Sequence, residues 1–322
     1  MLDGEIQVRV SAKRLEADGV ASFELVSTNA DPLPPFSAGS HIDVRMPNNM
    51  VRQYSLCNSP AESHRYLIAV LRDPNTRGGS AYMHDMVHEG QSLKISTPRN
   101  FFVLDRDARK SVLVAGGIGV TPILCMAERL AHTGAEFQMH YASRSPNRTA
   151  FVERIRSSSY FPQVQLHFDD GPASQRFDAD KVLRVPNAST HLYVCGPGGF
   201  IDYVLGTAKR LGWAETNVHR EYFGAAAQPK DASGESFEVE ISSTGEVLNV
   251  PAEKSVVQVL AEHGIDIPVS CEQGVCGTCV TRLLGGEPDH RDMVLTESEH
   301  RKNDRFTPCC SRSKSGRLVL DL

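Results

Sequence analysis

The first 104 residues alternate apolar and polar side chains with a period of two. The alternation is interrupted by turn residues, and it recurs in six segments: 6–15, 22–27, 41–46, 53–58, 65–73 and 92–97. This pattern is typical of half-buried strands, because successive side chains of a strand point to opposite faces. Several short strands at this spacing predict an antiparallel barrel or sandwich over residues 1–104.

The pattern changes between residues 105 and 225, where continuous apolar runs alternate with helical spacing. The predicted strands are 111–117, 137–144, 164–171 and a strand with a following turn at 191–200. The predicted helices are 120–134, 150–158 and 201–212. Strands that alternate with helices predict an α/β domain with a parallel sheet covered on both faces.

A third domain is predicted at residues 234–322. It is preceded by small and polar residues without periodicity, which predict a linker at 226–233. Within the domain, residues 236–252 predict two strands around a Thr-Gly turn, 255–264 predict a helix that ends at glycine, and 317–322 predict a strand.

Composition limits the possible classes of protein. The chain has 322 residues, of which 40% are hydrophobic and 23% charged, as expected for several folded domains. No apolar run reaches the roughly 18 residues that span a bilayer, and the N-terminus has no signal-peptide pattern, so we expect a cytoplasmic protein. The net charge of −5 gives no reason to expect a nucleic-acid partner. Residues 234–322 carry a net charge of −6, with nine basic and 15 acidic side chains.

The cysteines are clustered. Five of the eight lie in the last 52 residues, with the spacing Cys271-x4-Cys276-x2-Cys279 and a fourth thiol at Cys309 or Cys310. Four thiolates at this spacing predict a plant-type 2Fe-2S cluster. A four-cysteine zinc site is the alternative, but zinc sites favour two C-x2-C pairs and this chain has one.

A glycine-rich turn, Gly116 to Pro122, connects an apolar strand to a helix. Such a turn lets a pyrophosphate approach the helix N-terminus, although it also serves as a plain tight connection. The turn lacks the G-x-G-x-x-G pattern, and Asp169 and Asp170, which follow a later strand, are candidates for contacts to a ribose or form a solvated turn.

A third motif combines Arg52-Gln53-Tyr54-Ser55 with Arg77-Gly78-Gly79-Ser80. Arginine can bind a phosphate through two hydrogen bonds, and glycine N–H groups with a serine hydroxyl can complete a phosphate cradle. Tyr54 and Ser55 are then placed to lie against a ring system. Taken alone, these residues are ordinary in strands and turns.

The three motifs in this order resemble the phthalate dioxygenase reductase family, which includes vanillate O-demethylase reductases, over essentially the whole chain. The resemblance implies an FMN site with Arg52 at the phosphate and Tyr54 and Ser55 at the isoalloxazine. Its remaining FMN-binding residues are Gln53, Ala69, Val70, Leu71, Gly78, Gly79 and Ser80. Leu71 departs from the family, which often has a basic residue there.

The resemblance also implies a nicotinamide site. Its nucleotide turn consists of Gly116, Gly117, Gly119, Thr121 and Pro122, with Asp170 as the ribose contact and Cys195, Gly196 and Pro197 reaching the nicotinamide. Phe223, in Glu221-Tyr222-Phe223, covers the flavin ring. Ser55, Cys195 and Phe223 are the implied catalytic residues, although Cys195 also fits a small buried residue at a strand end.

The implied architecture is multidomain. It comprises an antiparallel β-barrel FMN domain (1–104), an α/β parallel-sheet NAD-binding domain (105–225) and an α+β β-grasp plant-type ferredoxin domain (234–322). The implied metal ligands are Cys271, Cys276, Cys279 and Cys309, since the family pattern places the ligand before the small residue that Cys310 replaces.

The implied activity begins with hydride transfer from NADH to FMN and continues with single-electron transfer through the 2Fe-2S cluster. The sequence shows no haem-binding pattern and no two-histidine-one-carboxylate set. The acceptor is therefore expected to be a separate protein. The resemblance implies that it is a Rieske-type oxygenase that hydroxylates or demethylates an aromatic acid, served by a monomeric reductase without membrane or nucleic-acid partners. The acidic ferredoxin domain is expected to dock on a basic patch, or its charge is simply solvated surface.

Three other functions remain open. They are a stand-alone diaphorase, a reductase for a haem-thiolate monooxygenase, and a ferredoxin fused to a structural barrel. NADPH also remains open as the coenzyme, because Arg144 follows a strand at a position that could meet a 2′-phosphate.

Overall fold

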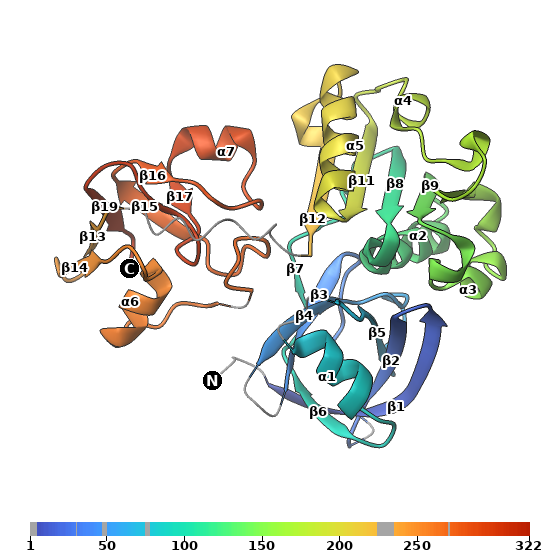
Figure 1. Cartoon of the computed structure of the whole chain (residues 1–322), viewed down its shortest axis with the longest axis horizontal. Helices are drawn as coiled ribbons and strands as arrows, with labels where there is room; N and C mark the ends of the chain where they lie inside the picture. The colour runs from blue at the N-terminus through green and yellow to red at the C-terminus, as the bar shows by residue number, and fades with distance from the viewer. Residues whose placement is uncertain (1–4, 30, 47–49, 75–77, 224–234, 270) are drawn as a thin grey trace. The chain divides into compact units, whose positions relative to one another are not determined.

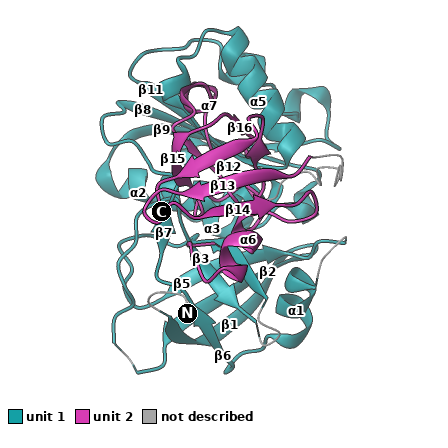
Figure 2. Cartoon of the chain, turned by 90° about the vertical axis from the view of Figure 1, so that its left-hand side faces the viewer, with its two compact units in different colours: residues 1–221 teal, residues 222–322 magenta. Residues whose placement is uncertain are grey.

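The computed structural model describes residues 5–29, 31–46, 50–74, 78–223, 235–269 and 271–322. Its contacts divide the chain into two compact units, residues 1–221 (unit 1) and 222–322 (unit 2), which Figure 2 distinguishes by colour. The predicted linker at 226–233 lies outside the described residues. No helix in the described ranges is both long and apolar enough to cross a membrane.

The N-terminal part of unit 1 is an antiparallel barrel. Its strands are β1 (Ile6–Ala17), β2 (Val20–Ser27), β3 (Ser40–Arg45), β4 (Val51–Ser55), β5 (Tyr66–Leu71), β6 (Ser92–Ile95) and the short β7 (Arg99–Asn100). They pair in the order β4-β3-β6-β1-β2-β5, and a bridge from Leu56 to Ile68 of β5 closes the sheet on itself. Inward-facing residues such as Val8, Phe23 and Ile42 fill the core. The predicted barrel is therefore confirmed.

One helix of this part was not predicted from the pattern. It is α1 (Gly79–Met86), which begins inside the predicted phosphate motif. Gly78 precedes it with a φ of 100°, a left-handed conformation that glycine adopts without strain.

The second part of unit 1 alternates strand and helix along the chain (Figure 1). Its strands are β8 (Lys110–Gly116), β9 (Glu136–Ser143), β10 (Val164–Phe168), β11 (Thr190–Gly196) and β12 (Val218–Tyr222). Its helices are α2 (Val120–Thr133), α3 (Val152–Arg156), α4 (Ala179–Val182) and α5 (Gly198–Arg210), and a short 3₁₀ turn, η1 (Gly117–Gly119), joins β8 to α2. The sheet order is β10-β9-β8-β11-β12.

This sheet is covered on both faces, as predicted. Strands β10, β9, β8 and β11 pair in parallel. Leu113 and Ala115 of β8 belong to the apolar cluster that contains α2, whereas Val112 and Val114, which point to the other face, are equally buried. Helix α5 packs against β11. Crossover helices bury parallel strands on both faces, which explains the continuous apolar runs in the sequence.

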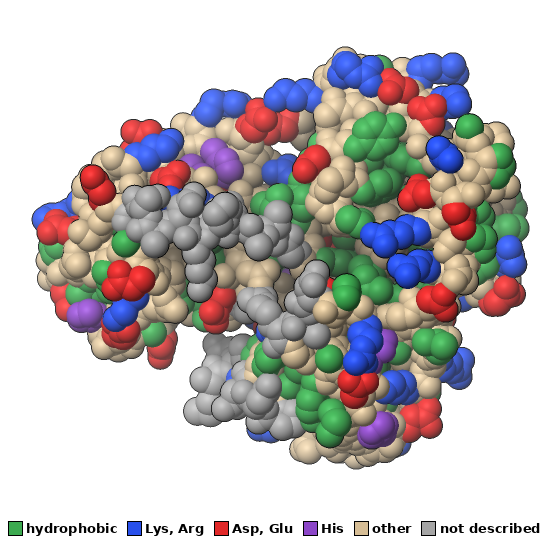
Figure 3. Space-filling view, viewed as in Figure 1, with side chains coloured by type: hydrophobic (Ala, Val, Ile, Leu, Met, Phe, Trp, Pro, Cys, Tyr) green, Lys and Arg blue, Asp and Glu red, His purple; other side chains and the backbone are tan. Residues whose placement is uncertain are grey.

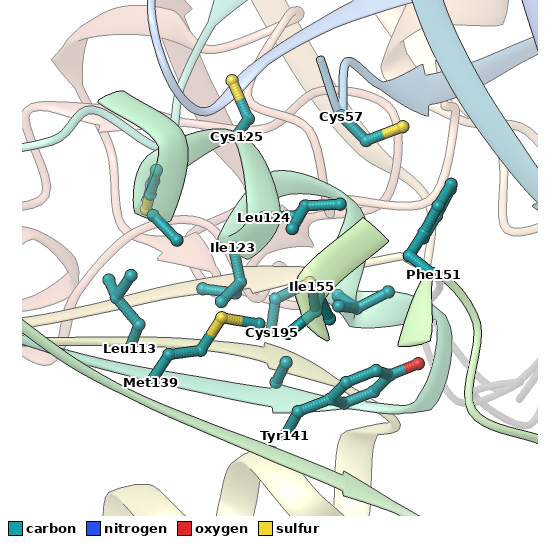
Figure 4. Packing of buried hydrophobic residues seen from close by; sticks show 14 of the residues in the cluster. Cys57, Leu113, Ile123, Leu124, Cys125, Met139, Tyr141, Phe151, Ile155 and Cys195 are labelled. Atoms are coloured by element: carbon teal, nitrogen blue, oxygen red, sulfur yellow. The ribbon is translucent and has the colours of Figure 1, made fainter. Parts of the chain in front are cut away.

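The barrel and the α/β part share one apolar core. Barrel residues Val20 and Leu67 lie in the same buried cluster as Ile123 and Leu124 of α2. Figure 4 shows Cys57 of the barrel beside Cys125 and Leu124 of that helix. The shared core explains why these two parts form a single compact unit.

Unit 2 is a mixed sheet with helices, the β-grasp arrangement that was expected. Its strands are β13 (Phe237–Ile241), β14 (Val247–Val250), β15 (Thr281–Gly285), β16 (Pro288–Asp289), β17 (Arg305–Phe306), β18 (Arg312–Ser313) and β19 (Arg317–Leu320). Its helices are α6 (Val256–Glu262) and α7 (Glu297–Lys302). The main sheet has the order β14-β13-β19-β15-β17, with β13 and β19 parallel. Helix α6 packs against β14 and begins with a capping box between Ser255 and Gln258.

The glycine turn after β8 packs directly on the end of β11. A Cβ on Gly119 would lie 2.3 Å from the carbonyl oxygen of Cys195. A Cβ on Gly196 would lie 3.0 Å from the Cα of Gly116, so these two turns touch backbone to backbone. Only glycine allows this approach at position 119, because the opposing atoms are main chain and cannot rotate away.

We expect Gly119→Ala to destabilise unit 1 by about 1–3 kcal/mol, since the new methyl group must displace the end of β11. Thermal unfolding followed by circular dichroism measures the change. Gly206→Ala is the matched control, because no atom lies within 4 Å of its Cβ position in α5. The control should unfold at the wild-type temperature or higher. Equal unfolding temperatures for Gly119→Ala and wild type would contradict the packing argument.

Candidate active site

Arg52 lies over the first turn of α1. A Cβ on Gly79 would lie 2.7 Å from Nε of Arg52. The Nη1 of Arg52 donates to the carbonyl oxygen of Val51 at 2.8 Å. The preceding residue, Gly78, offers no side-chain cap to the first-turn N–H groups of this eight-residue helix. A guanidinium and a helix N-terminus thus converge, and together they form a donor set that fits a phosphate group.

The other residues of the predicted FMN motif lie close to this point along β4 and α1. The Gln53 amide Nε2 lies 3.2 Å from the ring Nε2 of His41, and the Ser80 hydroxyl accepts from the N–H of Asp73 at 3.1 Å. Burial raises the pKa of the Tyr54 hydroxyl above its usual value, despite the opposing effect of Arg52. Tyr54 is therefore a neutral aromatic surface at physiological pH.

Strand β5 brings the second predicted FMN segment to the glycine turn. Ala69 and Val70 are buried, whereas Leu71 is 42% exposed at the strand end. Strand β5 contacts η1, the turn that contains Gly117 and Gly119. Two segments predicted for different cofactors therefore lie side by side within unit 1.

Ser55 is hydrogen-bonded to a half-buried carboxyl group that was not assigned from the sequence. Its hydroxyl donates to Oε2 of Glu221 at 3.3 Å. Burial raises the pKa of Glu221 to about 8, although the hydrogen bond from Ser55 acts in the opposite direction. Glu221 follows three half-buried residues of β12. Its position in the Glu221-Tyr222-Phe223 motif was the only signal in the sequence that pointed to it.

Cys195 is the next-to-last residue of β11, and its side chain is completely buried. Figure 4 shows it near Ile123 and Met139. Burial raises the pKa of its thiol well above the usual value, and the nearby Glu221 adds to the effect. Cys195 is thus held as a neutral thiol beside the glycine turn, and its predicted contact with a nicotinamide stays a prediction.

The turns after β8 and β11 leave space beside their glycines. Gly117 has a φ of 54° and no atom within 4 Å of its Cβ position, and the same space is present at Gly198 and Gly199 after Pro197. Thr121 uses its hydroxyl locally, donating to the carbonyl oxygen of Ile118 at 3.1 Å. Pro122 is buried in the first turn of α2.

The structure also brings Asp170 to this edge of the sheet. Its N–H donates to the carbonyl oxygen of Arg144 at 3.0 Å, so the turn after β10 lies against the end of β9. The carboxyl ends of parallel strands are where α/β sheets bind nucleotides. Asp170 and Arg144 lie at this edge, and their predicted contacts with a ribose and its 2′-phosphate stay predictions.

Phe223 belongs to unit 2, whereas Ser55 and Cys195 belong to unit 1. The Phe223 side chain is 43% exposed. Its predicted cover of a flavin ring stays a prediction.

Four thiols converge in unit 2. The Cys271 sulfur lies within hydrogen-bond reach of Cys276 and Cys309, and Cys279 lies within reach of Cys309. These contacts hold the pKa of Cys271 well below its usual value, because its neighbours donate to it. A set of four soft sulfur ligands fits an iron–sulfur cluster.

Glycine shapes the loop that carries three of these thiols. Gly274 and Gly277 have φ values of 73° and 74°, the left-handed region that a loop wrapping around a cluster needs. Cys276 and Cys279 are buried, and the Cys276 thiol donates to the Thr278 hydroxyl at 3.2 Å.

The Cys310 sulfur also lies within hydrogen-bond reach of Cys309, but it is Cys309 that reaches both Cys271 and Cys279. The Cys310 sulfur lies 3.3 Å from the Thr307 hydroxyl and 3.9 Å from that of Ser311. A Cβ on Gly274 would lie 2.4 Å from this sulfur, so Cys310 packs behind the cluster loop. This geometry favours Cys309 over Cys310 as the fourth ligand.

One expectation is wrong. No two-histidine-one-carboxylate set was recognised in the sequence, yet the structure brings together His290, Asp292 and His300, with their potential ligand atoms within 4.8 Å of one another. The three residues span a strand end, a loop and helix α7, and no known spacing signature marks them in the sequence.

Two family models match separate parts of the chain. Residues 239–314 match the 2Fe-2S iron–sulfur cluster binding domain. Residues 92–218 match the N-terminal domain of dimethylamine monooxygenase subunit DmmA-like proteins.

Similar proteins extend over the full chain. A vanillate O-demethylase oxidoreductase of Pseudomonas sp. strain HR199 is 53% identical, with 98% of this chain and 100% of the relative covered. The phthalate dioxygenase reductase of Burkholderia cepacia is 41% identical over 99% of this chain and 98% of its own. A solved phthalate dioxygenase reductase, described as a modular structure for electron transfer from pyridine nucleotides to 2Fe-2S, has a TM-score of 0.73 at 40% identity and covers 99% of this chain and 98% of its own.

The fold and the convergent thiols define an oxidoreductase, the reductase component of an oxygenase system, that passes electrons from a pyridine nucleotide to a 2Fe-2S centre. Full-length similarity makes the assignment more specific. The chain belongs to the phthalate dioxygenase reductase family, together with the vanillate O-demethylase oxidoreductases.

The two adjacent cysteines provide a direct test of the ligand set. We expect Cys309→Ser to lose the visible absorbance of the 2Fe-2S cluster, because oxygen is a poor substitute for a thiolate ligand. Cys310→Ser should keep the absorbance of wild type and about one cluster per chain by iron analysis. The reverse result, with the cluster lost only in Cys310→Ser, would assign the fourth ligand to Cys310.

Glu221 should make the stability of unit 1 depend on pH. Its pKa is raised in the folded state from 4.5 to about 8, so the folded chain binds more protons than the unfolded chain between these values. The free energy of unfolding therefore falls as pH rises through this range. Between pH 5 and pH 8.5, the free energy of unfolding of wild type should fall by about 1.4 kcal/mol or more relative to that of Glu221→Gln. This difference corresponds to a pKa shift of one unit or more.

Thermal unfolding of both proteins at the two pH values measures this difference. Each kcal/mol corresponds to about 2–4 °C in the unfolding temperature for a unit of this size. If the unfolding temperatures of wild type and Glu221→Gln differ by the same amount at both pH values, Glu221 is already ionised in the folded state at pH 5.

Proposed function

We propose that the chain is an NADH-dependent FMN and 2Fe-2S reductase that supplies a Rieske-type oxygenase which demethylates vanillate. The observation that carries this proposal is the 53% identity to a vanillate O-demethylase oxidoreductase over the full length of that relative. The cradle formed by Arg52 and the N-terminus of α1 supports FMN, because a mononucleotide presents a terminal phosphate.

Bound FMN accepts two electrons as a hydride and can release them singly, which a nicotinamide cannot do. Residues of the chain hold the cofactors in place and set the charge around them. Arg52 binds the phosphate, and the glycine turn at Gly117 and Gly119 receives the dinucleotide beside β5. Glu221 stays protonated below about pH 8, so it places no negative charge next to Ser55 and Cys195.

The cluster is held by Cys271, Cys276, Cys279 and Cys309 in this proposal. Three come from one loop and the fourth from the segment before β18, so the folding of unit 2 sets the geometry of the ligand set. The free cysteines fit a reducing compartment, and we place the protein in the cytoplasm as a monomer.

An acidic docking surface fits the charge of residues 234–322, which carry a net −6. Figure 3 shows acidic side chains on the surface of unit 2, interspersed with basic ones. We propose that this excess of acidic charge attracts a basic patch on the oxygenase.

A second partner is favoured by a specific observation. The chain matches the structure of an intact type IV self-sufficient cytochrome P450 monooxygenase with a TM-score of 0.87 and 36% identity, covering 99% of this chain but 41% of that protein. A separate haem-thiolate monooxygenase is therefore the alternative acceptor.

A coupled assay tests the proposal. Purified reductase and NADH, mixed with a purified vanillate-demethylating oxygenase, should consume vanillate and release formaldehyde, at a rate that falls as salt rises. Cys309→Ser should keep dye reduction by NADH within about twofold and lose the coupled reaction more than tenfold, since only the latter needs the cluster. NADPH in place of NADH should slow both reactions.

Three results would redirect the proposal. Turnover with a haem-thiolate monooxygenase but not with the Rieske oxygenase would favour the alternative acceptor. Coupled turnover that persists in Cys309→Ser would show a path that bypasses the cluster. A rate independent of ionic strength would count against electrostatic docking.

A further inference from the structure

A cluster of three metal-ligating side chains lies in unit 2, apart from the four converging cysteines. His290 follows β16, Asp292 lies in the next loop, and His300 projects from α7. Their potential ligand atoms all lie within 4.8 Å of one another. Two imidazoles and a carboxylate form a donor set typical of zinc and related transition-metal sites.

The backbone holds Asp292 in place. Its Oδ2 accepts from the N–H groups of Val294 at 3.1 Å and Leu295 at 2.7 Å, and its side chain is fully buried. Its other oxygen, Oδ1, faces the two imidazoles, with His300 Nε2 at 3.2 Å and His290 Nδ1 at 3.7 Å. One carboxylate oxygen is thus committed to the fold and the other is presented to the histidines.

His290 contributes a buried ring nitrogen that faces Asp292. Its side chain is only 9% exposed, and its Nδ1 is buried without a hydrogen-bond partner. The opposite ring nitrogen, Nε2, lies 3.2 Å from the side-chain oxygen of Asn303. Since that oxygen can only accept, Nε2 donates a proton to it, and Nδ1 is the ring nitrogen that faces the carboxylate and is available to a cation.

A cation bound between Nδ1 of His290 and Oδ1 of Asp292 gives the unpartnered ring nitrogen a partner in this buried place. The rings of His290 and His300 stack at 4.2 Å with an angle of 20° between their planes, so both present ring nitrogens to the same oxygen of Asp292. Ligand atoms around tetrahedral zinc lie roughly 3.3 Å apart, so side-chain shifts of about an ångström complete the site. The oxygen of Asn303 then acts as the outer partner that orients a metal-bound histidine.

We propose that His290, Asp292 and His300 bind one divalent transition-metal ion of the zinc type. His300 is 29% exposed, which leaves an entry path and a position for a water ligand. Magnesium and calcium fit poorly, because both prefer oxygen ligands and this set offers two nitrogens.

The site adjoins the loop between Cys271 and Cys276. The N–H of Met293 donates to the carbonyl oxygen of Gly274 at 2.9 Å, and a Cβ on Gly274 would lie 3.1 Å from the Cα of Asp292. A metal ion that ties Asp292 to His290 and His300 therefore braces the segment on which this loop rests. The three proposed ligands include none of the cysteines, so the metal ion can bind to them whichever oxygenase accepts the electrons.

Zinc titration of the full chain with its 2Fe-2S cluster in place tests the proposal. After dialysis against a chelator, isothermal titration calorimetry with zinc chloride should show one equivalent bound to wild type, while the visible absorbance of the cluster stays constant. His300→Gln and His290→Gln should each weaken binding tenfold or more. His132→Gln is the matched control, because this exposed histidine lies at the end of α2, and it should bind as wild type does.

A crystal of the zinc-soaked protein gives a second measurement that does not depend on variants. Anomalous scattering at the zinc edge should place the ion between His290 and Asp292. Absence of stoichiometric binding in wild type would overturn the proposal and leave a proton shared between His290 and Asp292. Wild-type affinity in both histidine variants, or zinc located on the cysteines, would overturn it as well.

Discussion

The close approach of Gly119 to the carbonyl oxygen of Cys195 is the constraint on which the nucleotide half of the molecule depends. It lets the turn after β8 sit on the end of β11, and α2 can then begin directly above the sheet. Helix α2 in turn supplies Ile123 and Leu124 to the core shared with the barrel. The packing of one turn on the end of β11 thereby connects the cofactor edge of the sheet to the packing of both parts of unit 1.

The long elements could be predicted from the sequence because their burial has a simple period. Strands β1 and β6 of the barrel alternate buried and more exposed residues, and β8 and β11 are buried over most of their length because both faces of the parallel sheet are covered. The short elements gave no such signal. Helix α7 is entirely polar and owes its start to a capping box between Thr296 and Glu299, and β16 to β18 have two residues each. Pairing across the fold creates these elements, and local periodicity does not reveal them.

Some residues of the candidate sites could be predicted from local sequence, whereas others could not. The thiols at 271, 276 and 279 are close in sequence, so their spacing predicts their chemistry, and the convergence of Arg52 with Gly79 follows from two local motifs. Glu221 and the trio of His290, Asp292 and His300 depend on contacts between distant segments. Ser55 and Glu221 are 166 positions apart, and no local pattern encodes such a pair.

Cysteines are buried in both units, and the groups around each thiol assign them different chemistry. Within unit 1, burial raises the pKa of Cys57 to about 12, and the Cys57 thiol donates to the carbonyl oxygen of Leu67 at 3.2 Å, so it behaves as a small apolar side chain. In unit 2 the sulfurs face one another across a loop shaped by Gly274. A thiolate is a ligand only where positive charge compensates it, and mutual facing of four sulfurs is favourable only around metal ions. The unpartnered Nδ1 of His290 likewise faces Oδ1 of Asp292 in a buried place, and a bound cation gives that nitrogen a partner.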